Sequence, residues 1–209
     1  MKRIILAAVA LLAFGFVKAQ VKQSASNTRF GIKGGMNVAT LTGDEEDTKS
    51  LIGLHIGGIV ECKINDKFAI QPELLFSMQG TKYEYSGYDG FETYYAEDKF
   101  KLNYLNIPIM AKYYAAKKFY IEAGPQIGFL LSARYEYSDS VYGSGEEDAK
   151  DYVKSVDFGL NIGAGFDFTD NVFAGVRYNF GLSNINDFED DDDFKSHNGV
   201  LSISAGYKF

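Results

Sequence analysis

The chain contains two histidines, and serines and acids lie near one of them. His55 and His197 are the two histidines, with Ser196 and Ser202 on either side of the second and an acidic tract before it. Serine, histidine and an acid are the groups that nucleophilic acyl transfer uses, because the imidazole takes the proton of the attacking hydroxyl. No spaced motif joins these residues here. A hydrolytic or acyl-transferring site is therefore a hypothesis, and we expect a non-enzymatic protein without a cofactor.

A run of acids after residue 188 offers oxygen ligands to a hard cation such as Ca²⁺. It contains Asp190, Asp191, Asp192 and Asp193. The run lacks the spaced acids and the turn glycine of an EF-hand loop, and adjacent carboxylates more often form a solvated, repulsive surface. Weak divalent-cation binding by this loop stays open as an alternative, and no metal site is assigned.

In several other segments, apolar and polar residues alternate with a period of two, which is typical of β-strands. From Val156 to Phe168 every second residue is apolar or alanine, and the intervening residues are glycine, asparagine or aspartate. The pattern predicts eight strands. They cover 29–40, 51–64, 68–81, 100–114, 119–135, 155–168, 172–183 and a last strand that ends at Phe209.

The connections between these strands alternate in length. Short turns lie at 65–67, 115–118 and 169–171. Long acidic segments lie at 41–50, 84–98, 136–152 and 184–197, and we expect them to be loops. Short turns at one end and long loops at the other are typical of an up-and-down barrel in an outer membrane. The formal net charge of −7 argues against a nucleic-acid partner.

The first nineteen residues resemble a cleaved signal peptide. Lys2 and Arg3 precede an apolar stretch from Ile4 to Phe16, and Val17-Lys18-Ala19 provides small residues at −3 and −1. The stretch is too short for a membrane-spanning helix. The sequence thus predicts a signal peptide at 1–19 and one barrel domain at 20–209. Cys62 is the single cysteine, which excludes an intrachain disulfide.

The apolar faces of the strands could point to lipid or to a soluble core. Their length, the absence of charge from their centres and the small polar residues opposite them favour lipid. The chain ends on Phe209, with Tyr207 on the same face, as in barrels inserted into an outer membrane. We therefore predict an all-β fold, an eight-stranded antiparallel up-and-down transmembrane β-barrel in the outer membrane of a Gram-negative cell.

The polar face of such a barrel lines an interior that side chains just fill. Charges of both signs in so narrow a space should pair, because an isolated buried charge is costly. We predict a plugged lumen centred on Glu73, Glu122 and Arg177, and a charged conduction path is the alternative. The predicted inward charges are Lys33, Glu61, Glu73, Lys112, Glu122, Arg134, Asp157, Asp167 and Arg177.

In this topology we expect His55 and His197 near the extracellular rim. Tyrosines among the acidic segments could form a recognition surface or an interfacial belt. We expect the belt for Tyr83, Tyr85 and Tyr135. Surface recognition is the expectation for Tyr88, Tyr94 and Tyr95.

Six stretches resemble the PorT-like outer-membrane β-barrel family over roughly the whole mature chain. They are GIKGGMN from Gly31, QPELLFSMQG from Gln71, YLNIPIMAKYY from Tyr104, YIEAGPQIGFLLSA from Tyr120, VRYNFGLSNI from Val176 and the closing GYKF. Asn106 stands where such proteins often have an acid. The resemblance implies an outer-membrane barrel, and some relatives serve in secretion or gliding machinery.

We expect a structural or partner-docking role in the cell envelope. The expected partners are outer-membrane lipid and lipopolysaccharide, and an envelope or secretion-machinery protein. A small-solute channel is the second hypothesis for the function, and a lipid- or peptide-modifying enzyme is the third.

Overall fold

The strands of this protein close into a ring. The computed structural model describes residues 27–88, 93–139, 143–187 and 194–209. These residues form nine strands and one turn of 3₁₀ helix. They are β1 (Thr28–Gly43), β2 (Lys49–Lys63), β3 (Phe68–Tyr88), β4 (Thr93–Tyr114), β5 (Phe119–Asp139), β6 (Gly143–Asp148), η1 (Lys150–Tyr152), β7 (Val156–Asp167), β8 (Val172–Gly181) and β9 (Ser196–Lys208).

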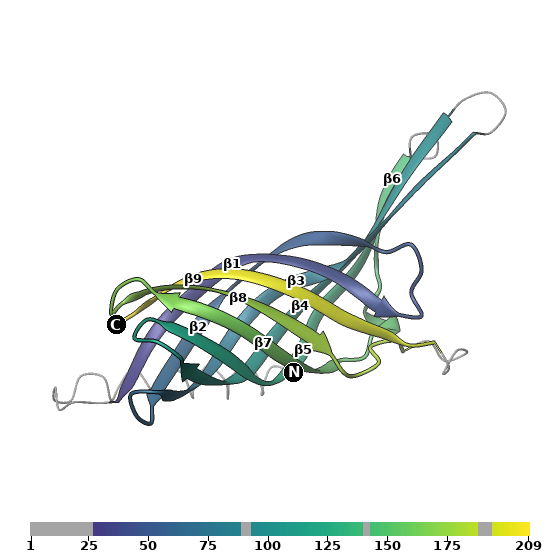
Figure 1. The fold of residues 1–209 in the computed structure, drawn as a ribbon. Helices are drawn as coiled ribbons and strands as arrows, with labels where there is room; N and C mark the ends of the chain where they lie inside the picture. Colours follow the sequence, from purple (N-terminus) through teal and green to yellow (C-terminus); the bar gives the residue numbers. More distant parts are fainter. Residues whose placement is uncertain (1–26, 89–92, 140–142, 188–193) are drawn as a thin grey trace.

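Every strand pairs antiparallel with its neighbours. The order is β4-β3-β2-β1-β9-β8-β7-β5-β6, and β4 also pairs with β5. The barrel wall therefore contains eight strands, and β6 lies outside the ring as an additional strand on β5 (Figure 1). This confirms the predicted eight-stranded barrel. In the described part of the chain, no helix is long and apolar enough to cross a membrane.

The apolar face of the wall points outward. Ile52, Ile56 and Ile203 are each at least 60 % exposed, whereas the charged side chains of Glu61 and Lys112 inside the ring are almost fully buried. This distribution is the reverse of a water-soluble barrel and matches a wall surrounded by hydrocarbon. The expectation that the apolar face contacts lipid is confirmed.

Short turns and aromatic rings gather at one end of the barrel. The turns after β2, β4 and β7 join strands that end and begin within five residues of each other, and the C-terminus lies at this end (Figure 1). Exposed rings surround it, as in the aromatic girdle at a membrane interface. They are Phe68, Tyr113, Phe119, Phe166, Phe168, Tyr207 and Phe209.

At the opposite end, four strands extend beyond the rest of the wall. We call residues 82–88 of β3, 93–101 of β4, 134–139 of β5 and all of β6 the projecting sheet (Figure 1). The prediction that 84–98 and 136–152 are loops is wrong for most of these residues. The acids fit strands here because Lys82 and Lys99 form ion pairs with them along and across the sheet.

The prediction that Arg134 faces the lumen is also wrong. Asn103 pairs with Ser132 but the next residue of β4, Tyr104, pairs with Leu130, so β5 contains one extra residue at this point. A bulge of this kind reverses the alternation of the strand. Ala133 therefore points inward, and Arg134 is exposed and forms an ion pair with Glu146 of β6.

Candidate functional site in the barrel lumen

A cluster of four charges occupies the middle of the lumen. Arg177 of β8 donates two hydrogen bonds to Glu73 of β3, Nη1 to Oε2 at 2.9 Å and Nη2 to Oε1 at 2.8 Å. Its Nε donates to Glu122 of β5 at 2.9 Å. Lys33 of β1 lies 3.2 Å from the same Glu73. Two cations and two carboxylates balance, so the cluster carries no net charge across four separate strands.

A second balanced cluster lies closer to the short turns. Lys112 of β4 and Lys208 of β9 contact Glu61 of β2 at 3.1 and 3.2 Å. Lys208 also lies 3.1 Å from Asp167 of β7, and the Tyr114 hydroxyl donates to Glu61 at 3.0 Å. The side chains of Lys112, Lys208 and Glu61 are fully buried, and that of Asp167 is 13 % exposed. Charges buried in this way persist only when each is paired and hydrogen-bonded.

Gln71 links the two clusters. Its carbonyl oxygen accepts a hydrogen bond from Lys112 at 2.8 Å, and its amide nitrogen donates to Glu73 at 2.7 Å. The lumen is thus filled by one continuous polar network rather than by two separate patches.

Glycines on the inner face make room for the large side chains of the lumen. A Cβ on Gly165 would lie 2.3 Å from the Tyr120 ring, and one on Gly206 would lie 2.3 Å from the Phe173 ring. Both rings in turn lie against cations. The Lys112 ammonium lies 3.8 Å from the centre of the Tyr120 ring, and the Lys208 ammonium lies 5.3 Å from the centre of the Phe173 ring. The glycine-rich inner faces therefore let aromatic rings close the space around the buried charges.

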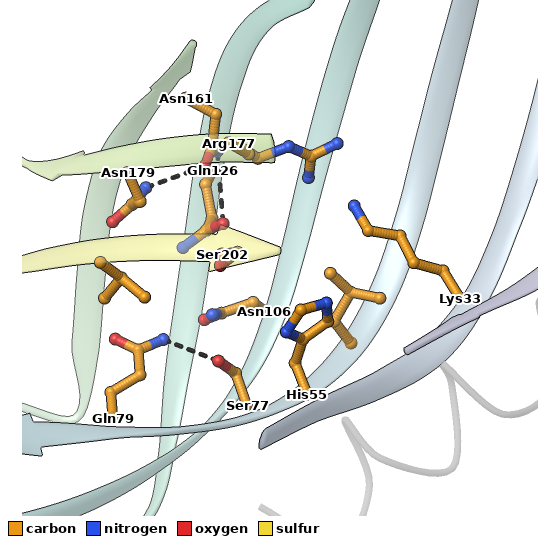
Figure 2. A pocket seen from close by; sticks show the side chains of 12 residues that line it. Lys33, His55, Ser77, Gln79, Asn106, Gln126, Asn161, Arg177, Asn179 and Ser202 are labelled. Carbon is orange, nitrogen blue, oxygen red and sulfur yellow. Dashed lines mark hydrogen bonds between the residues drawn. The ribbon is translucent and has the colours of Figure 1, made fainter. Parts of the chain in front are cut away.

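Small cavities remain on both sides of the central cluster, an upper one toward the mouth and a lower one toward the short turns. The upper one has about 20 Å³ of space for water and lies between Lys33 and Arg177 on one side and Gln79 and Asn179 on the other (Figure 2). The lower one has about 10 Å³ and also touches Lys33 and Arg177. Spaces of this size hold about one water molecule. The central cluster separates them.

His55 lies inside the lumen, and the prediction that it lies near the rim is wrong. It is 5 % exposed and borders the upper cavity (Figure 2). Its Nδ1 is 2.8 Å from Asn37 Oδ1 and its Nε2 is 3.0 Å from Ser204 Oγ. A serine, a histidine and an amide in this order resemble a nucleophile, its base and an orienting group. The cavity beside them has room for water but not for an organic substrate.

His197 lies at the start of β9 and contacts backbone rather than a nucleophile. Its Nδ1 lies 2.8 Å from the carbonyl oxygen of Ser183. The neighbouring Ser196 donates to Glu45 at 2.9 Å, and Ser202 donates to Asn37 at 2.8 Å. His197 and Ser196 thus have separate partners, whereas His55 and Ser202 both contact the Asn37 side-chain oxygen.

The mouth of the barrel opposite the short turns is covered by apolar side chains. Segments after β6 and after β8 cross the opening and pair through Val153 and Asn186. Asp157 lies just below this cover, where it accepts hydrogen bonds from Ser183 at 2.6 Å and Asn198 at 2.9 Å. The cover is the cluster Leu41, Leu102, Tyr104, Leu130, Ala133, Ala149, Val153 and Ile185.

The predicted charged residues thus fall into four groups. Lys33, Glu73, Glu122 and Arg177 meet in the central cluster. Glu61, Lys112 and Asp167 belong to the second cluster, Asp157 lies alone near the mouth and Arg134 lies outside the lumen. Asp190, Asp191, Asp192 and Asp193 lie outside the described residues. Within the described residues, no three His, Cys, Asp or Glu side chains are grouped so that they could hold a metal ion.

Sequence reasoning missed Lys208 as a member of the network. It is fully buried and holds two carboxylates. Its position on the polar face of the last strand, after Ser202, Ser204 and Gly206, was the available signal.

The projecting sheet has two different faces. The face that continues the lumen carries Tyr83, Tyr85 and Tyr135. Tyr83 donates to Glu45 at 2.7 Å and Tyr135 donates to Asp98. The expected lipid-facing belt position of these three tyrosines is therefore wrong. The side chains of Tyr88 and Tyr94 are outside the description, and Tyr95 is 67 % exposed.

The opposite face of the projecting sheet is a ladder of exposed ion pairs. Glu84 contacts both Lys49 and Lys82, and Lys101 contacts Glu136. This face continues the lipid-facing side of the wall, but its charge places it outside the hydrocarbon layer. The sheet therefore extends into the aqueous phase beyond the membrane.

Comparison with known proteins decides the family. Residues 18–187 match the family described as outer membrane protein beta-barrel domain. The chain belongs to this family. It is an outer-membrane barrel, as predicted, with the charged lumen and projecting sheet described above. No curated protein matches the chain in sequence.

Solved outer-membrane barrels are similar in structure at low sequence identity. Neisserial surface protein A is 16 % identical, with a TM-score of 0.49, over 90 % of this chain and 100 % of that one. The attachment invasion locus protein Ail of Yersinia pestis is 14 % identical, with a TM-score of 0.47, over 87 % and 99 %. OprG of Pseudomonas aeruginosa is 11 % identical, with a TM-score of 0.41, over 87 % and 95 %.

Proposed function

We propose that this barrel is a non-enzymatic docking protein of the outer membrane, which presents its projecting sheet to a protein partner. The observation that carries the proposal is the contrast between a filled lumen and four strands that extend past the membrane. A structure that served only to span the lipid would not need β6 or the long ends of β3, β4 and β5. The surrounding lipid and lipopolysaccharide are the other expected contacts.

The partner class is a protein of the envelope or of a secretion machinery. The PorT-like stretches support this choice, since some proteins of that group serve in secretion. The exposed tyrosines and acids of the projecting sheet give a surface with both apolar area and hydrogen-bonding groups.

The lack of an enzymatic role is part of the proposal. It is supported by the position of His55, whose neighbour Ser204 lines the lower cavity of about 10 Å³, which has room for about one water molecule. A refolded preparation that hydrolysed lipid or peptide esters, and lost this activity in His55→Ala, would contradict it.

A small-solute channel is the second candidate, and one observation favours it. The cavities above and below the central cluster are both lined by Lys33 and Arg177. Displacement of these two side chains would join the cavities and widen the path.

Conductance of the refolded protein in a planar bilayer separates the two functions. We expect a silent bilayer, with folding checked by heat-modifiable migration on a gel. Discrete, reproducible steps would support the channel. A variant in which short turns replace the projecting sheet is the matched control, because the lumen stays intact.

Docking itself is tested with photo-crosslinking side chains in living cells. A crosslinker at Ser86 or Ser138, on the projecting sheet, is expected to give discrete protein adducts. The same group at Phe180, on the lipid-facing wall, is expected to give none. Adducts with lipopolysaccharide alone at all three positions would overturn the docking role.

A further inference from the structure

Strand β6 has one paired edge and one free edge. Its residues pair with β5 from Arg134 opposite Asp148 to Asp139 opposite Gly143. In the described residues, no strand pairs with the other side of β6, which is the last strand in the order of the sheet. Figure 1 shows β6 at the outside of the projecting sheet, away from the barrel wall.

The alternation of an antiparallel ladder identifies the backbone groups at this free edge. The Ala149 amide donates to the Ala133 carbonyl at 3.0 Å, so residue 149 faces β5. Alternate residues of an antiparallel strand direct their N–H and C=O groups to opposite sides. Ser144, Glu146 and Asp148 therefore direct their backbone donors and acceptors away from β5, where a further strand could bind them.

The sequence of β6 restricts such a strand mainly by its charge. Proteins commonly protect a free edge with charged side chains, especially lysine, or with proline or a bulge, and β6 contains neither lysine nor proline but three acids. The six residues of β6 are Gly143-Ser144-Gly145-Glu146-Glu147-Asp148, and five of them are exposed. The two glycines and the serine leave one half of the strand open to close backbone approach.

The other half of β6 carries three consecutive acids. A second copy of this strand placed along the edge would bring acids close to acids, which destabilises strand pairing. A strand rich in lysine or arginine would instead find opposite charges. Within the part of the chain that the structure describes, Glu146 is the one acid of the three that is paired with a cation, the exposed Arg134.

From the free edge and its charge we infer that the partner adds an extended basic segment to β6 as a further antiparallel or parallel strand. Backbone hydrogen bonds to Ser144, Glu146 and Asp148 supply the binding, and the acids select the basic segment. This inference rests on the proposed docking function and names the surface and the class of segment that docks.

The test uses the full refolded barrel in lipid nanodiscs and a fluorescent peptide in which lysine and valine alternate. We expect the peptide to bind and its counterpart with glutamate in place of lysine not to bind. Ser144→Pro removes one edge donor without removing a bond to β5. It is expected to weaken binding by about tenfold, the equivalent of one hydrogen bond.

Matched variants distinguish strand addition from general charge attraction. Glu147→Gln with Asp148→Asn is expected to weaken binding further. Asp66→Asn with Asp170→Asn makes the same change of charge in the short turns at the other end and is expected to have no effect. Amide exchange is expected to slow at Ser144, Glu146 and Asp148 when the peptide binds.

Three outcomes would overturn the inference. They are no binding of the basic peptide, equal binding to Ser144→Pro, and dimers of the barrel joined through β6. If photo-crosslinking at Ser86 and Ser138 still yields discrete protein adducts in these cases, the docking function stands and the partner uses another part of the projecting sheet.

Discussion

The lumen and the projecting sheet contain the same kinds of side chain in opposite surroundings. Lys33, Arg177 and Glu73 form ion pairs in the lumen with side chains at most 7 % exposed. Lys101 and Glu136 form an ion pair on the projecting sheet with side chains 38 % and 31 % exposed. A buried pair cannot lose one partner without leaving an unpaired charge, whereas water replaces the lost partner of an exposed pair. The lumen therefore tolerates little change, and the projecting sheet tolerates much.

The largest expected effect is at the centre of the lumen. Arg177→Met leaves Glu73 and Glu122 with one cation between them, and we expect it to lower the free energy of unfolding by about 3–5 kcal/mol. Urea unfolding in lipid vesicles, followed by the heat-modifiable gel shift, measures the change. Arg177→Met with Glu122→Gln keeps the Lys33–Glu73 pair in a neutral site and is expected to lose less. An equal loss in the two variants would show that burial of charge does not set the effect.

The next largest effect compares two glycines that each accommodate a tyrosine ring. Gly165→Ala pushes against the enclosed Tyr120 ring and is expected to destabilise the barrel by about 1–3 kcal/mol. Gly145→Ala meets Tyr137 in the same way on the projecting sheet. Tyr137 is 39 % exposed and can turn away, so the expected change is within about 0.5 kcal/mol. The same urea assay tests both, and the reverse order would contradict the comparison.

A smaller effect is expected for an exposed ion pair. Lys101→Met removes the partner of Glu136 and is expected to change the free energy of unfolding by about 0–1 kcal/mol. High salt should reduce the difference from the unchanged protein, because it screens exposed charges. A loss as large as that of Arg177→Met, or one that salt does not alter, would show that the projecting sheet is packed as tightly as the lumen.

The smallest effect is a dependence on pH confined to the projecting sheet. Hydrogen bonds from Lys49 and Lys82 lower the pKa of Glu84 from 4.5 to about 2. A carboxylate with a lowered pKa stabilises the folded strand fully above its usual pKa, and this contribution disappears as the pH falls from about 4.5 toward 2. Amide exchange in residues 82–88 should therefore accelerate over that range. Glu84→Gln should remove this step, and a step that persists in the variant would assign it to another group.

Much of the wall was predictable because one physical rule governs it. Hydrocarbon outside and a polar lumen inside force a period of two, so Glu73, Glu122 and Arg177 could be assigned to the inner face from the sequence. Arg134 could not be placed, because one extra residue near Leu131 reverses the alternation and the sequence gives only a weak sign of it, the apolar Leu130 on a polar face. The alternation of apolar and polar residues also does not give the position of a residue along the barrel axis. His55 consequently lies farther from the rim than expected.

The projecting sheet was missed for a different reason. Tyr83, Glu84 and Tyr85 alternate as a strand does, but their acidic surroundings indicate a loop. Cross-strand lysines offset the acids, and the register that brings Lys82 near Glu97 is a property of the folded hairpin. Local composition contains no information on that register.

Lys208 has a consequence for the order in which the barrel assembles. It is contributed by the last strand, yet it lies between Glu61 of β2 and Asp167 of β7, which are 147 and 41 residues away along the chain. Until β9 joins β1, these carboxylates lack their common cation and must remain near water. A stepwise entry of hairpins into lipid would carry unpaired charge into the hydrocarbon. Insertion into the membrane and closure of the ring are therefore coupled. Pairing of the final strand with β1 allows the other strands to enter the hydrocarbon together.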